Sequence, residues 1–118
     1  MRGFFTELDR LTRQSLLYQM MQKADDIVSK EKGLPMRHHL KTIQPYFNQV
    51  CSGRKTIEIR FNDRNFKQDD RLVLEEYDQD LDSYSGEQVV VHVTNVLKDF
   101  VGLNDGWVAM SIHIVEEE

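Results

Sequence analysis

The chain has 118 residues, enough for one small domain or one domain with an appendage. Its hydrophobic share of 40% and charged share of 30% are ordinary for a soluble globular protein, and no apolar run is long enough to span a membrane. The single cysteine, Cys51, excludes an internal disulfide and fits a reducing compartment, and the N-terminus lacks the pattern of a signal peptide. We therefore expect a cytoplasmic protein.

Charge is distributed unevenly along the chain, whose formal net charge is -5. Residues 36–71 carry eight Lys or Arg and four Asp or Glu, whereas residues 72–118 carry one basic and eleven acidic residues. A basic segment in an acidic chain favours a local anion site for a short RNA or a nucleotide over binding along a duplex, which needs many phosphate contacts. The alternative is that charges adjacent in sequence become mixed once the chain folds.

Residues 5–32 are predicted to form one long helix. Thr6 supplies a plausible start, the apolar residues form a broad stripe, and Gly33 followed by Pro35 ends the helix. We divide the chain into an N-terminal helical extension, residues 1–35, and a main domain, residues 36–118. The helix either covers the main domain or serves as a surface for a protein partner or a homodimer.

Two short elements follow this extension. Residues 36–41 are predicted to form a strand, and residues 44–52 a helix. Thr42 can cap that helix, and Pro45 lies near the first helical position that proline favours. Gly53 ends it.

Residues 56–61 alternate between polar and apolar, the pattern of a strand with one buried face. We expect the apolar residues to point into the core and the polar residues to lie together on the opposite face. The apolar set is Ile57, Ile59 and Phe61, and the polar set is Thr56, Glu58 and Arg60. Lys55 lies at the entrance of the strand, so one acid and two cations converge on a rigid stretch of main chain.

The rest of the chain is predicted to form strands joined by turns. The strands are residues 71–77, 88–97 and 107–115, and the connections are a turn at 62–65, a hairpin tip at 78–86 and a loop at 99–106. In the last strand the inward residues are Val108, Met110, Ile112 and Ile114. The acidic tip lacks the central glycine and final glutamate of a calcium loop. Five strands and one inserted helix predict a small, mostly antiparallel β-barrel.

The spacing Gly53-x-Lys55-x-x-Glu58-x-Arg60 resembles the signature of the ASCH family, relatives of the PUA RNA-binding domains. The flanking pieces resemble a branch of small phage and bacterial domains without an assigned function, and the resemblance spans residues 36–108. The resemblance implies an α+β fold, a small PUA-like barrel of about five strands with one short inserted helix, here preceded by the long N-terminal helix.

The charged cluster of Lys55, Glu58 and Arg60 has three interpretations. It is a surface ion pair worth about 0–1 kcal/mol, a ligand cradle, or a catalytic centre. In the cradle, Lys55 and Arg60 hold phosphate, and Glu58 accepts a base amino group or orients the cations. The remaining residues of this predicted RNA- or nucleotide-binding site are Lys41, Asn62, Arg64 and Trp107.

Certain ASCH relatives are amidohydrolases of acylated cytidine, and the resemblance makes Lys55 and Glu58 the catalytic candidates. Those enzymes carry threonine where this chain has Glu58, and their third residue, a glutamate, lies in a helical insertion that the loop at 99–106 lacks. We expect an RNA- or nucleotide-binding module. The alternatives are a small hydrolase of modified nucleosides or RNA in the same cleft, and a phage accessory protein that binds a host protein through residues 5–32.

No metal or cofactor is expected. The four histidines, at positions 38, 39, 92 and 113, lack the spacing of metal ligands, and no cysteine cluster joins them. Aromatic candidates for stacking on single-stranded RNA are Tyr46, Phe66, Tyr77, Tyr84 and Trp107. Trp107 is the best placed of these, because its neighbours in the strand alternate inward.

Overall fold

The structure is a computed structural model, which describes residues 20, 23, 24, 27 and 33–115. Strands make up 49% of these residues. The helix with defined bounds among them is α3, Tyr46–Cys51. The described chain is therefore mostly β, and the predicted α+β class is wrong.

The predicted long helix over residues 5–32 is also wrong for the described part of the chain, where no long N-terminal helix exists. Of that range only Met20, Lys23, Ala24 and Ile27 are described. The remainder lies outside the described residues, as does the partner or homodimer surface assigned to it. The division into residues 1–35 and 36–118 stays a prediction. No helix that the structure describes has the length and apolarity needed to cross a membrane.

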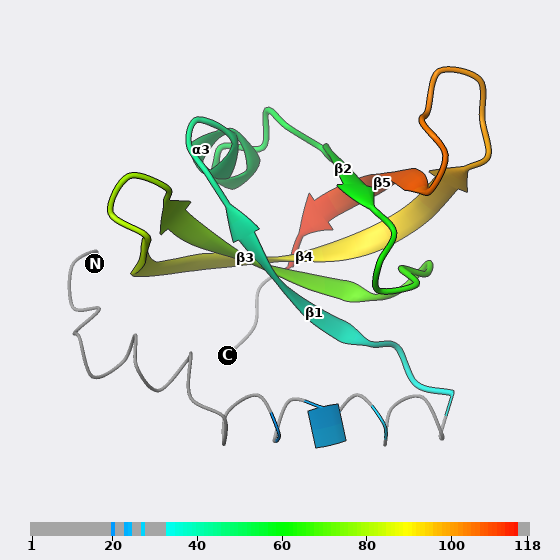
Figure 1. The fold of residues 1–118 in the computed structure, drawn as a ribbon, viewed down its shortest axis with the longest axis horizontal. Coiled ribbons are helices and arrows are strands. Elements are labelled where there is room, and N and C mark those ends of the chain that lie inside the picture. The colour runs from blue at the N-terminus through cyan, green and yellow to red at the C-terminus, as the bar shows by residue number, and fades with distance from the viewer. Residues whose placement is uncertain (1–19, 21–22, 25–26, 28–32, 116–118) are drawn as a thin grey trace.

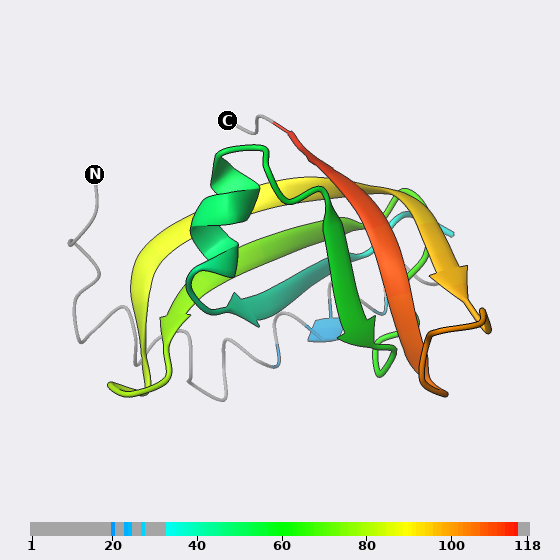
Figure 2. The same ribbon diagram turned by 90° about the horizontal axis from the view of Figure 1, so that it is seen from above.

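Five strands form one sheet in the order β1-β3-β4-β5-β2 (Figure 1). They are β1 (Arg37–Thr42), β2 (Ile57–Phe61), β3 (Arg71–Asp78), β4 (Ser83–Lys98) and β5 (Trp107–Ile114). β1 pairs with β3 in parallel, and the other pairs are antiparallel. The sheet curls into a half-barrel, seen from above in Figure 2. The five strands and their mostly antiparallel pairing match the prediction, but β1 and β2 are the two edges of an open sheet, so the sheet is a half-barrel where the sequence predicted a β-barrel.

The long strand β4 produces the curl because it pairs with β3 along its first half and with β5 along its second. The pairing with β5 shifts between Val93 and Asn95, and such a bulge increases the local twist and bends the strand. At the other end the β3–β4 pairing continues to Asp78 and Ser83, so the hairpin tip is shorter than predicted.

The core lies on the concave face of the sheet. Its buried residues are Leu40, Val50, Phe66, Leu72, Leu74, Val91, Val93, Val108, Met110 and Ile112. Helix α3 packs at one end of the half-barrel (Figure 2) and buries Phe47 and Val50. Thr42 does not cap this helix, because it is the last residue of β1. Instead, the Gln44 side chain accepts a hydrogen bond from the N–H of Asn48 at 3.1 Å.

The two faces of β2 are the reverse of the prediction. Ile57, Ile59 and Phe61 are 45%, 52% and 53% exposed, whereas Glu58 is 3% exposed. Alternation shows that a strand has two different faces, but not which face points inward. The carboxylate of Glu58 can lie inside because both of its oxygens accept hydrogen bonds from cations, which offset its loss of water.

Strand β5 follows the predicted alternation until its end. Val108, Met110 and Ile112 are buried, but Ile114 is 40% exposed and does not point into a closed core. The neighbouring strand β2 pairs with β5 only from Trp107 to Ser111. Ile114 therefore lies beyond the strand that would cover it.

Candidate functional site

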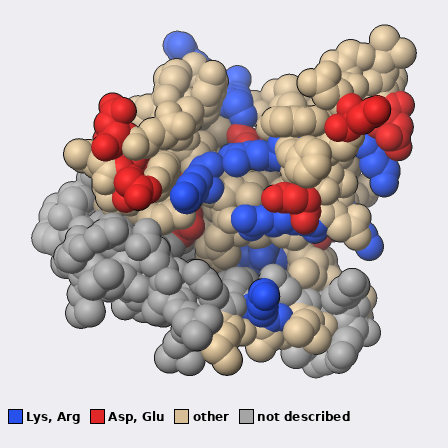
Figure 3. Space-filling view, in the orientation of Figure 1, with Lys and Arg blue, Asp and Glu red and all other residues tan. Residues whose placement is uncertain are grey.

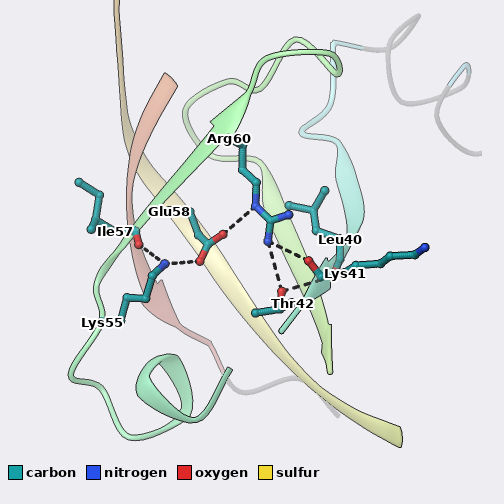
Figure 4. Close-up of polar contacts among 7 residues, drawn as sticks. All are labelled: Leu40, Lys41, Thr42, Lys55, Ile57, Glu58 and Arg60. Atoms are coloured by element: carbon teal, nitrogen blue, oxygen red, sulfur yellow. Dashed lines mark hydrogen bonds and ion pairs between the residues drawn. The ribbon is translucent and has the colours of Figure 1, made fainter. Parts of the chain in front are cut away.

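The candidate site is built around Glu58 (Figure 4). Its Oε1 accepts a hydrogen bond from Lys55 Nζ, and its Oε2 accepts one from Arg60 Nε at 2.9 Å. Lys55 Nζ also donates to the main-chain oxygen of Ile57, whose side chain points away from the cluster. Because Glu58 is buried, this is no exposed surface pair, and the two cations stabilise the carboxylate in its position.

Two arginines reach from the β2 side to the free edge of β1. Arg60 Nη2 donates to the main-chain oxygen of Lys41 at 3.1 Å and to Thr42 Oγ1 at 3.3 Å. Arg64, in the turn after β2, donates from Nη1 to the main-chain oxygen of His39 at 2.8 Å. These side chains occupy the place of the main-chain hydrogen bonds that would close the barrel.

A groove with a volume of ≈ 990 Å³ lies between the two edges. Four cations and two carboxylates are among its lining residues: Lys41, Lys55, Arg60, Arg64, Glu58 and Asp63. Figure 3 shows Lys and Arg gathered across the middle of this face, over the region between β1 and β2, with one acidic group beside them and further Asp and Glu toward the two ends. The groove therefore has a positive balance on a chain whose net charge is -5.

The predicted site residues Lys41 and Trp107 both line the groove, outside the charged cluster. Lys41 joins the cluster through its main-chain oxygen, while its side chain points away (Figure 4) and places Nζ 4.4 Å from the centre of the Tyr77 ring. Trp107 is 39% exposed and packs edge-on against Phe61, with ring centroids 6.0 Å apart.

Asn62 is the predicted site residue that does not line the groove. Its Oδ1 accepts a hydrogen bond from the N–H of Phe66 at 2.8 Å, and its own N–H donates to the oxygen of Gly106 at 2.7 Å. Asn62 therefore shapes the turn after β2.

Aromatic rings lie at both ends of the groove. Tyr77 and Tyr84 pack edge-on, 5.2 Å apart, and both line the groove together with the exposed ring of Tyr46. Trp107 lies at the other end of the lining, with Phe61. Phe66, the remaining aromatic candidate, is 4% exposed and belongs to the core, so it offers no stacking surface.

Sequence reasoning missed His39 and Thr42 as groove residues. Thr42 accepts the hydrogen bond from Arg60 and donates to the oxygen of Leu40 at 3.4 Å. His39 lies on the opposite face of β1, with its Nδ1 3.6 Å from an oxygen of Glu75. The sequence places both residues in a predicted strand. Their position beside the groove follows from β1 being an edge of the sheet, which the sequence does not show.

A second buried polar cluster lies at the start of β1 and β3. His38 Nε2 is 2.9 Å from Asp70 Oδ2, and the main-chain N–H groups of Met36 and Lys67 donate to the same carboxylate at 2.9 and 3.0 Å. Burial alone would raise the pKa of the Asp70 carboxyl, but these hydrogen bonds and the charge of His38 outweigh it and hold the pKa below its usual value. All four groups serve the fold.

Other reactive groups offer no second site. Burial and then the charge of Glu87 raise the pKa of the Cys51 thiol, which disfavours the nucleophilic thiolate. Among the described residues no group of His, Cys, Asp and Glu is placed to hold a metal ion. In the acidic tip, Asp78 Oδ1 accepts the N–H groups of Asp80 and Leu81 at 2.9 and 3.1 Å and so holds the turn.

The fold and groove define a small half-barrel domain, and comparison with known proteins places it in a family. Residues 37–112 match the family described as Domain of unknown function (DUF3850), and the chain belongs to that family. The chain is also similar to an "Uncharacterized 12.9 kDa protein in GpA 3'region" of Escherichia phage P2, with 34% identity over 73 residues. That match covers 57% of this chain and 65% of the phage protein, slightly under two thirds of its length.

Proposed function

We propose that this protein is an RNA- or nucleotide-binding module of the ASCH type, whose ligand lies in the groove between β1 and β2. The observation that carries the proposal is the gathering of four cations on a groove in an otherwise acidic chain. Such a concentration of charge attracts a short polyanion, while the acidic groups toward the ends of the same face (Figure 3) and the net charge of -5 disfavour a long one.

The division of labour within the groove follows from the contacts. Arg60 and Lys55 are held in place by Glu58, so they offer a preorganised positive surface. Arg64 donates one hydrogen bond from Nη1 to the main-chain oxygen of His39, and its other N–H groups can donate to a phosphate. The exposed aromatic rings at the two ends supply stacking surfaces for bases.

Binding is favoured over the alternative of hydrolysis in the same cleft. Each oxygen of Glu58 already accepts a hydrogen bond from a cation, so the carboxylate orients Lys55 and Arg60 and is poorly placed to take a proton from a substrate. The loop at 99–106, where the ASCH amidohydrolases carry their third residue in a helix, contains no helix here.

The test is fluorescence anisotropy with a labelled ten-nucleotide single-stranded RNA across a salt series. For single strands the slope of log affinity against log salt is about -0.7 per phosphate contact, so Lys55→Ala and Arg64→Ala should each weaken binding and reduce that slope by about one contact. Lys98→Ala removes an exposed cation outside the groove lining and should change neither quantity. Equal losses in all three variants, or binding unaffected by Lys55→Ala, would contradict the proposal.

A further inference from the structure

The free edge of β2 borders the groove, and its main-chain groups can be assigned from the pairing with β5. Ile112 N–H donates to the oxygen of Thr56 at 3.0 Å, and Asn62 N–H donates to the oxygen of Gly106 at 2.7 Å. Main-chain groups alternate along a strand, so the even-numbered residues of β2 bond to β5 and the odd-numbered ones point to the groove. The odd-numbered residues are Ile57, Ile59 and Phe61.

Two of the three carbonyls on this edge have partners within the chain. The oxygen of Ile57 accepts from Lys55 Nζ, and the oxygen of Phe61 accepts from the N–H of Asp63 at 2.9 Å. The middle residue, Ile59, presents its N–H and its C=O side by side toward the groove, and no contact among the described residues uses either group.

Across the groove the carbonyls of β1 are occupied too. Arg64 donates to the oxygen of His39, and Arg60 donates to the oxygen of Lys41. The carbonyls of His39, Lys41, Ile57 and Phe61 thus all accept hydrogen bonds within the chain, whereas the carbonyl of Ile59 has no partner among the described residues. A donor and an acceptor left unpaired at one point of a ligand-sized groove favour a ligand with a complementary pair, since unpaired polar groups are costly once covered.

Both the Watson–Crick edge of a nucleobase and an extended peptide present an adjacent donor and acceptor. The surroundings of Ile59 favour the base. Aromatic rings line the groove, including the exposed Tyr46 and Trp107, and so do two cations that can bind a phosphate, Lys55 just before β2 and Arg60 on it.

We propose that the groove binds one unpaired nucleobase through the main-chain N–H and C=O of Ile59, so that its ligand class is a single-stranded or free nucleotide with an open Watson–Crick edge. This inference rests on the proposed function. It goes further because base-paired RNA could not bind in this way, since the Watson–Crick edge of a paired base is already hydrogen-bonded to its partner base.

The first experiment alters the ligand. Labelled octamers of A, C and U are titrated into the full chain, and the tightest binder is compared with the same octamer methylated on its Watson–Crick edge in a form that stays uncharged (N6,N6-dimethyladenosine, N4,N4-dimethylcytidine or N3-methyluridine). Methylation leaves every phosphate in place and should weaken binding about tenfold, the scale of one lost bidentate base contact. The complementary duplex should weaken it at least as much.

The second experiment alters the protein. Ile59→Pro removes the N–H at this position, and proline is tolerated on an edge strand where that N–H makes no ladder bond. It should weaken binding of the unmethylated octamer about tenfold and leave binding of the methylated one unchanged. Ile59→Thr keeps the N–H and should bind as the unaltered chain does. Circular dichroism tests whether both variants fold. If Ile59→Pro does not fold, the comparison of methylated and unmethylated octamers still tests the inference.

Equal binding of methylated and unmethylated octamers would overturn this inference, and if Lys55→Ala still weakened that binding the proposed function would stand. Failure of every octamer to bind would overturn both. A third outcome is that an extended peptide of alternating threonine and valine binds saturably and RNA does not displace it. This result would show that the groove binds an added β-strand, and it would overturn the inference as well.

Discussion

Arg60 donates a hydrogen bond to the main-chain oxygen of Lys41, 3.1 Å away, although the strands that carry these two residues stand at opposite ends of the sheet. One side chain thereby connects the two edges of the half-barrel. The same guanidinium also binds Glu58 and Thr42. The bridge and the candidate site are one structure, so stability and binding should depend on the same side chains.

Replacing Arg60 by alanine should lower the free energy of unfolding by about 1–2 kcal/mol, because it removes charge-assisted hydrogen bonds and leaves the buried Glu58 with Lys55 alone. Arg54→Ala removes an exposed arginine from the segment before β2 and should stay within about 0.5 kcal/mol of the original chain. Urea denaturation of both variants measures the difference. Equal stability of the two would show that the bridge contributes nothing.

Glu58→Gln should destabilise the fold by about 1–3 kcal/mol. The glutamine amide offers one oxygen and one NH2 group, so the NH2 group must face the N–H of either Lys55 or Arg60, donor against donor. A double-mutant cycle with Lys55→Met separates this pair from its surroundings. Additive effects would mean that Lys55 and Glu58 do not interact, contrary to the geometry.

The lowered pKa of Asp70 predicts that the folded protein loses stability at acid pH. Its pKa in the folded protein lies below its unfolded value of about 3.9, so the unfolded chain takes up the proton first as the pH falls. The stabilisation is complete above that unfolded value and is lost as the pH falls through the lower, folded pKa. At pH 7, Asp70→Asn should cost about 1–3 kcal/mol, and the difference from the original chain should shrink in acid.

Asp69→Asn provides the matched control for Asp70. Asp69 pairs with His92 at 2.9 Å, but its side chain is 60% exposed, so water screens the pair. Unfolding curves of this variant between pH 7 and pH 3 should run parallel to those of the original chain. An equal loss of unfolding free energy in both variants would show that the buried cluster around Asp70 has no special role in stability.

Gly106 should not tolerate alanine. Its φ is +83°, and an added Cβ would lie 2.8 Å from the ring of Phe61. Gly102→Ala at φ +98°, with no neighbour within 4 Å, measures the backbone cost alone. Gly106→Ala should therefore cost about 1–2 kcal/mol more than Gly102→Ala in thermal unfolding and should alter the fluorescence of Trp107, which packs on the same ring.

The position of the strands could be read from the sequence more easily than their surroundings. Hydrophobic alternation placed β2 and β5 close to their observed bounds, because the period of two is a local property of the chain, and the acidic pair before residue 71 marked the start of β3. It assigned the faces of β2 wrongly, since the burial of Glu58 depends on its hydrogen bonds with Lys55 and Arg60, and Arg60 is in turn held by Thr42 of β1 at the opposite edge of the sheet. The long helix over residues 5–32 was expected from local signals, an apolar stripe with a start and a stop, and no long N-terminal helix exists in the described part of the chain.

For the site, the order of residues was enough to bring two cations and an acid close together, because Lys55, Glu58 and Arg60 are carried by one short strand and its entrance. It could not show that β1 and β2 are the edges of an open half-barrel, or that arginines connect them. Those features come from pairing between distant segments, which no local pattern records, so the groups left unpaired along the two edges became visible in the folded chain alone.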